Sequence, residues 1–161
     1  MNNEEKFKVF LEVAGALNKS FDITPVLYGS LGLYRVIQAS GVVNDVDVLV
    51  PHKFVNDEWE KLVDFMKGLG FRLKDEHEHE FEREREFVAF AAGLDLVEMI
   101  GIQPGELKIS DIDGVRFKEL SPEQYLKLYQ FMLRDNYRQE KRGTADQEKI
   151  ALINKYLSAK N

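Results

Sequence analysis

Residues 27–50 read LYGSLGLYRVIQASGVVNDVDVLV, and this stretch carries the strongest structural signals of the 161-residue chain. The apolar run 26–28 stops at a Gly-Ser pair, and residues 31–39 then carry apolar side chains at helical spacing. Residues 42–50 alternate aspartate with valine and leucine before a proline, a pattern typical of a strand. The stretch therefore predicts a strand, a Gly-Ser turn, a helix and a second strand.

Two aspartates, Asp45 and Asp47, lie two residues apart in the second predicted strand. Side chains alternate across a strand, so both carboxylates should point to one face while Val46 and Val48 point to the other. Neighbouring like charges repel, and a hard divalent cation such as Mg²⁺, which prefers carboxylate oxygens, would relieve that repulsion. The alternative is a pair of surface aspartates on an exposed strand, although aspartate is depleted in strands.

Gly29 and Ser30 lie where the first predicted strand meets the helix. A glycine at this point allows the backbone to approach a ligand closely, and the following helix N-terminus offers free N–H groups to a phosphate. The serine adds a hydroxyl donor. Taken alone, the same pair also fits a simple helix cap at a strand-to-helix turn.

The rest of the chain contains helical and strand patterns in mixed order, which predicts an α+β fold. Residues 87–91 and 94–100 are interpreted as two strands of a hairpin that turns at Ala92-Gly93. Further helices are predicted over 4–19, 54–69, 122–138 and around Ile150, Ile153 and Leu157, and further short strands over 71–73 and 115–117.

The strand, Gly-Ser turn, helix and Asp-x-Asp strand together resemble the signature of the DNA polymerase β-like nucleotidyltransferase superfamily. The resemblance implies that Gly29 and Ser30 hold a nucleoside triphosphate and that Asp45 and Asp47 bind Mg²⁺ or Mn²⁺. It also implies a third carboxylate, on a neighbouring strand, that completes the metal site and acts as the base. Asp95, in the segment LDLVEMI, fits this role, because strand alternation would turn Glu98 to the opposite face.

The C-terminal part, ELSPEQYLKLYQFMLRDNYRQEKRGTADQEKIALI, resembles the closing helices of small stand-alone members of the superfamily. Lys127 matches the lysine that would reach the triphosphate, and Asp146 matches a later aspartate. The resemblance thus implies a nucleotidyltransferase-like mixed β-sheet flanked by helices, with a core over 1–118 and C-terminal helices over 119–161 in a single compact unit.

The implied activity is the transfer of a nucleoside monophosphate from a nucleoside triphosphate to a hydroxyl acceptor on a small molecule, a protein or an RNA end. The alternative is a member that no longer catalyses and serves as a binding or partner module, for example in a toxin–antitoxin pair. Acceptor, preferred base and oligomeric state leave no signal in the sequence.

Composition limits the partners, the metal sites and the cellular location to be expected. Lys and Arg total 22 against 28 Asp and Glu, a net charge of −6 that disfavours nucleic acid as a general partner. The chain has no cysteine, which excludes disulfides and thiolate metal sites, and no apolar stretch approaches the ~20 residues of a membrane helix. A cytoplasmic location without membrane contact is expected.

The densest basic patch is Arg134, Arg138, Lys141 and Arg142, which fits a solvated helix end better than an RNA site.

Residues 75–86, DEHEHEFERERE, are the most unusual segment. On a strand, His77 and His79 would share one face, where they could bind a metal ion, although a solvated charged hairpin or loop is favoured. By the same alternation, Arg83 and Arg85 would form a positive face that could contact phosphate.

Overall fold

The computed structural model describes residues 1–134 and 136–160, and segment 136–143 by its backbone alone. The strands are β1 (Val26–Tyr28), β2 (Val46–Val50), β3 (Arg72–Asp75), β4 (Glu80–Arg83), β5 (Glu86–Ala92), β6 (Lys108–Ile112) and β7 (Val115–Glu119). The helices are α1 (Asn3–Phe21), α2 (Gly29–Val36), α3 (Trp59–Gly68), α4 (Leu94–Ile100), α5 (Pro122–Leu133) and α6 (Asn136–Lys160), with short 3₁₀ turns at η1 (His52–Val55) and η2 (Pro104–Glu106).

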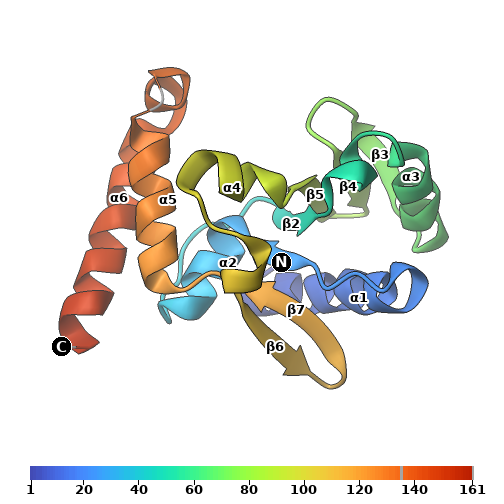
Figure 1. Cartoon of the computed structure of the whole chain (residues 1–161), viewed down its shortest axis with the longest axis horizontal. Helices are drawn as coiled ribbons and strands as arrows, with labels where there is room; N and C mark the ends of the chain where they lie inside the picture. The colour runs from blue at the N-terminus through green and yellow to red at the C-terminus, as the bar shows by residue number, and fades with distance from the viewer. Residues whose placement is uncertain (135, 161) are drawn as a thin grey trace.

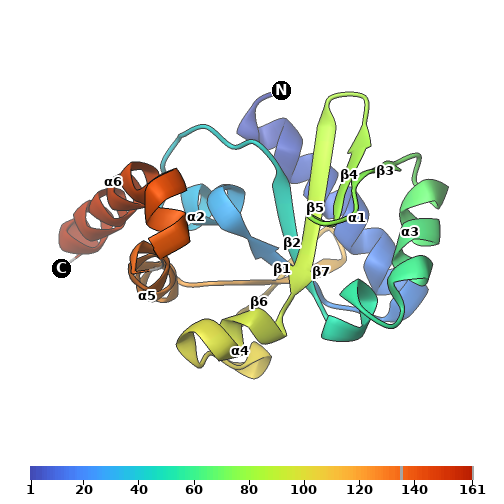
Figure 2. The ribbon, with the colours of Figure 1, turned by 90° about the horizontal axis from the view of Figure 1, so that it is seen from above.

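Within the described residues, seven strands form one mixed sheet in the order β3-β4-β5-β2-β1-β7-β6 (Figure 1). Strand β2 at its centre runs antiparallel to β1 and parallel to β5. Helices α1 and α3 lie on one side of the sheet, whereas α2, α5 and α6 lie on the other (Figure 2). The α+β fold with a mixed sheet flanked by helices, expected from the sequence, is confirmed.

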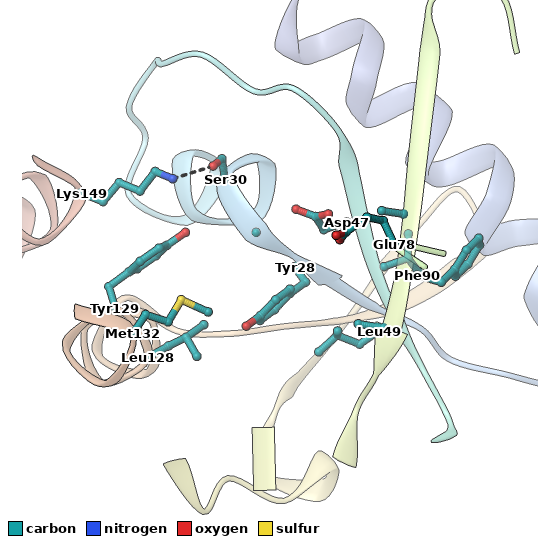
Figure 3. Close-up of a pocket in the computed structure, with 14 residues that line it drawn as sticks. Tyr28, Ser30, Asp47, Leu49, Glu78, Phe90, Leu128, Tyr129, Met132 and Lys149 are labelled. Carbon is teal, nitrogen blue, oxygen red and sulfur yellow. Dashed lines mark hydrogen bonds between the residues drawn. The ribbon is translucent and has the colours of Figure 1, made fainter. Parts of the chain in front are cut away.

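Apolar packing fixes α1 on its side of the sheet. The helix buries a stripe at helical spacing, and its Phe10 ring meets the edge of Phe117 on β7 at 5.3 Å between centroids. Val46 and Val48 of β2 are buried, in alternation with the partly exposed Asp47. The opposite face, which carries Asp47, is therefore the one toward α2, α5 and α6 (Figure 3).

The strand predicted over 94–100 was wrong, and so was the hairpin at Ala92-Gly93. The sheet ends with β5 at Ala92, and the residues that follow form helix α4, which ends at Gly101 with a φ of +69°. Short apolar runs fit either a strand or a helix period. In this helix only Leu96 is buried, and Leu94 is 44% exposed; the segment packs against α5 and β5 instead of extending the sheet.

Other boundaries moved by a few residues. Strand β2 begins at Val46, so Asp45 lies just before it, and the helix predicted over 54–69 divides into η1 and α3. In the charged segment 75–86, residues 76–79 form a turn and residues 80–83 form β4; the sequence patterns did not distinguish the turn from the strand. No helix in the described part of the chain is long and apolar enough to span a membrane.

Candidate active site

Gly29 opens α2 in a left-handed conformation, with a φ of +67°. A Cβ placed on this residue would lie 2.1 Å from Oδ2 of Asp47, far inside van der Waals contact. Glycine is therefore required twice, for its backbone angle and for the space that the carboxylate occupies. The turn and the carboxylate form one unit, because Tyr28 of β1 pairs with Asp47 of β2 across the sheet.

Two adjoining cavities meet at this turn, and both are lined by Ser30, Asp47 and Lys149. The larger, of about 460 Å³, lies between the loop before β2 and α6, and Asp45 also lines it. The smaller, of about 230 Å³, lies between the sheet and α5 and is drawn in Figure 3. Gly29, Ser30, Asp45 and Asp47, all singled out in the sequence, are thus brought together.

The cation beside the turn is Lys149 of α6, which sequence reasoning missed. Its Nζ donates a hydrogen bond to Oγ of Ser30 at 2.9 Å and lies 5.3 Å from the centre of the Tyr129 ring (Figure 3). Lys127, which the sequence favoured, is exposed on α5 and lines neither cavity. The sequence contained a signal for this lysine: Lys149 lies four residues before Ile153 of the predicted apolar stripe, and so shares that face of the helix, where Ile153 is fully buried.

Asp95 does not join Asp45 and Asp47. It is exposed in the first turn of α4 and lines neither cavity, because the strand that was to orient it is a helix. Among the residues whose side chains the structure describes, no group of three or more His, Cys, Asp or Glu could hold a metal ion. The expected convergence of three aspartates is therefore reduced to two.

Two carboxylates nevertheless suit one particular metal. Mg²⁺ keeps several waters and is usually held by one or two carboxylates together with substrate phosphates, not by a cage made of protein alone. The donor set of Asp45 and Asp47 fits a divalent ion that arrives with a triphosphate.

In the unusual segment 75–86, some side chains stabilise the fold and one lines a cavity of the candidate site. Arg83 donates to Glu12 at 2.9 and 2.7 Å, to Glu86 at 2.6 Å and to the Leu69 carbonyl at 2.8 Å, so its charge is used within the fold. The His79 ring packs on Trp59 at 4.8 Å between centroids. Glu78, by contrast, lines the smaller cavity opposite Lys149 (Figure 3). The side chains of Arg138, Lys141 and Arg142 lie outside the described part of the chain.

Beneath the turn, α2 rests on Tyr125 of α5. A Cβ on Gly32 would lie 2.2 Å from the Tyr125 hydroxyl, so a glycine is again needed for close approach. Burial raises the pKa of this phenol well above its ordinary value and keeps it neutral. The hydroxyl has no hydrogen-bond partner within the described residues.

The chain was compared with protein families and with individual known proteins. No protein-family model matches the chain. The chain is 35% identical over 151 residues to the uncharacterized protein YnaI of Bacillus subtilis (strain 168). The aligned region covers 94% of this chain and 97% of YnaI.

Two solved structures share its architecture. The solution structure of the antibiotic-resistance factor ANT(2'')-Ia superimposes with a TM-score of 0.61 at 13% identity, over 99% of this chain and 88% of that one. An antigenic nucleotidyltransferase-like protein from Paracoccidioides brasiliensis also gives 0.61, at 16% identity over 95% and 77% of the two chains. The fold is that of polymerase β-like nucleotidyltransferases.

Proposed function

From the premise that this chain belongs to one family with Bacillus subtilis YnaI and has a nucleotidyltransferase fold, we propose that it transfers a nucleoside monophosphate from a nucleoside triphosphate to a hydroxyl acceptor. The observation that carries the proposal is local. The turn residue Ser30, the carboxylates of Asp45 and Asp47 and the ammonium of Lys149 surround one cavity of about 460 Å³, within the size range of small-molecule sites.

The triphosphate would lie along the N-terminal turn of α2. Backbone N–H groups after Gly29 and the Ser30 hydroxyl can donate to phosphate oxygens, which favour the positive end of a helix. Lys149, already at 2.9 Å from the Ser30 hydroxyl, would take the role first given to Lys127 and pair with the β- and γ-phosphates.

Asp45 and Asp47 would hold Mg²⁺ or Mn²⁺ delivered with the nucleotide. When bound, the ion supplies neutralisation of the charge that builds on the leaving pyrophosphate. The packing of Asp47 against Gly29 holds this carboxylate next to the turn, so the metal-binding and phosphate-binding groups keep a fixed spacing.

A binding assay tests the proposal. Titration calorimetry with ATP, GTP, CTP and UTP in Mn²⁺ should give a binding isotherm for at least one of them. The same nucleotide should show metal-dependent pyrophosphate release in the presence of glycerol and other polyols. Asp47→Ala should abolish both signals. Asp64→Ala, which alters an exposed aspartate of α3, is the matched control and should leave both unchanged. Wild-type protein that binds none of the four at millimolar concentration would contradict the proposal.

The second candidate function is a nucleotide-binding or partner module without catalysis. It is favoured by the reduced carboxylate set, since Asp95 lies away and no three metal ligands converge within the described part. The same assay separates the two candidates, because a nucleotide-binding module would bind nucleotide without releasing pyrophosphate, and a partner module would do neither.

A further inference from the structure

On the face that it shares with Asp47, the neighbouring strand β5 offers no carboxylate. In the register of the sheet, Asp47 pairs with Ala89 on β5, and Ala89 pairs in turn with Glu80 on β4. Directly paired residues share one face, so the β5 side chains on the Asp47 face are Phe87, Ala89 and Ala91. None of the three can accept a proton.

A carboxylate reaches the same cavity from one strand further out. Glu78, in the turn between β3 and β4, lines the cavity of about 230 Å³ with Asp47 and Ala89. Figure 3 shows Glu78 and Asp47 on one side of this cavity and Ser30 with Lys149 on the other. The methyl group of Ala89 leaves open the space above β5 that a larger side chain would fill.

The carboxylate of Glu78 is available, whereas its neighbour is not. Glu80 forms an ion pair with Lys74 at 3.1 Å, and that hydrogen bond raises the pKa of Lys74. The Glu78 side chain makes no ion pair or hydrogen bond within the described residues, and its polar contact there runs through its backbone N–H, which donates to Asp75 at 3.1 Å.

The turn itself is anchored on both sides. The Phe90 N–H donates to the carbonyl of His79 at 3.1 Å, and the His79 ring packs on Trp59 of α3. A general base must be in place before the proton moves, and an ordered turn at the wall of a cavity meets that requirement when its carboxylate makes no ion pair or hydrogen bond in the described part of the chain.

We propose that Glu78 is the general base of the transfer reaction, an assignment that rests on the proposed function. The acceptor hydroxyl oxygen forms a bond to the α-phosphorus while the bond from that phosphorus to the pyrophosphate oxygen breaks. The hydroxyl proton passes to the Glu78 carboxylate, and pyrophosphate leaves with the bonding electrons. Glu78 acts apart from the metal-binding pair, because no three carboxylates in the described part of the chain are placed to hold one ion.

The test compares Glu78→Gln with Glu76→Gln, a matched change at an exposed glutamate of the same turn that lines neither cavity. Two quantities are measured for each variant and for wild type. One is the Kd for α,β-methylene-ATP with Mn²⁺, by calorimetry; the other is the rate of pyrophosphate release from ATP with glycerol and water as acceptors. Thermal unfolding checks that the variants remain folded.

Glu78→Gln should slow release by about 10²- to 10⁴-fold, the usual contribution of a general base, and leave the Kd within about twofold. Glu76→Gln should change neither. Release by Glu78→Gln at the wild-type rate would overturn the assignment and leave the proposed function standing. A parallel loss of nucleotide binding would also overturn it, since Glu78 would then belong to the binding site. Wild-type protein without release would refute the proposed function and the assignment with it.

Discussion

The contact between Gly29 and Asp47 can be tested by adding one methyl group. Gly29→Ala would place a Cβ 2.1 Å from Oδ2 of Asp47 and would force an L-residue to keep a φ of +67°. The left-handed backbone costs about 1–2 kcal/mol for a residue other than glycine. For a domain of this size, that corresponds to a Tm lower by about 2–8 °C.

Two other glycines separate the backbone cost from the contact. Gly101 has a φ of +69° and no atom within 4 Å of its would-be Cβ, so Gly101→Ala carries the backbone cost alone. Gly68 ends helix α3 with equal space and without a positive φ, so Gly68→Ala should be neutral or stabilise by up to about 1 kcal/mol. Any loss in Gly29→Ala beyond that of Gly101→Ala then measures the displacement of Asp47.

The assay is thermal unfolding of the three variants, followed by calorimetry with Mn²⁺ and α,β-methylene-ATP. Gly29→Ala should lower the Tm more than Gly101→Ala and should alone weaken nucleotide binding, because the displaced carboxylate leaves the metal-binding pair. Equal Tm losses in Gly29→Ala and Gly101→Ala, with nucleotide binding intact in both, would refute the idea that this contact positions Asp47.

Three further changes give independent tests. Lys149→Ala should weaken binding of α,β-methylene-ATP with Mn²⁺ at least tenfold, whereas Lys127→Ala, which alters an exposed lysine, should leave the Kd unchanged; equal effects in calorimetry would contradict the choice of lysine. The hydrogen bond from Arg83 lowers the pKa of Glu12 below its ordinary value of 4.5, so this carboxylate stabilises the fold above that pH. Denaturant unfolding of Glu12→Gln should therefore show a deficit at pH 7 that shrinks as the pH falls below 4.5; a constant deficit would contradict this. Tyr125→Phe removes a buried hydroxyl without a hydrogen-bond partner in the described part, so it should raise stability by about 1 kcal/mol, and a lower Tm would contradict that account.

The part of the site that sequence could predict is the part built from near neighbours in the chain. Residues 26–50 contain the turn, the helix and the strand with their own local signals, and strand alternation is enough to place Asp47 and Val48 on opposite faces. Tertiary structure then has only to pair β1 with β2, which brings Asp47 against Gly29.

The choice of lysine was open to a better argument from the sequence. Tyr125, Leu128 and Tyr129 form the buried stripe of α5, and the helical period of 3.6 places Lys127 on the opposite side of that helix. Lys149 falls on the stripe of α6 that contains Ile153. Helical position, applied to each lysine, favours the residue that the structure places beside the turn.

The proposed general base is harder to predict from the sequence than the turn or the lysine, because its position depends on the register of three strands. No residue near Ala89 in the chain indicates that Ala89 will lie beside Asp47. Likewise, no residue near Glu78 indicates that its turn will line the same cavity as Asp47. The segment LDLVEMI offered an aspartate at a plausible spacing, and a short apolar run cannot tell a strand from a helix. A carboxylate supplied by a turn outside β5 leaves that strand free to carry alanine where the sheet faces the cavity. The face of β5 that lacks a carboxylate and the turn that projects Glu78 are thus two parts of one arrangement, and a general base at Glu78 would account for both.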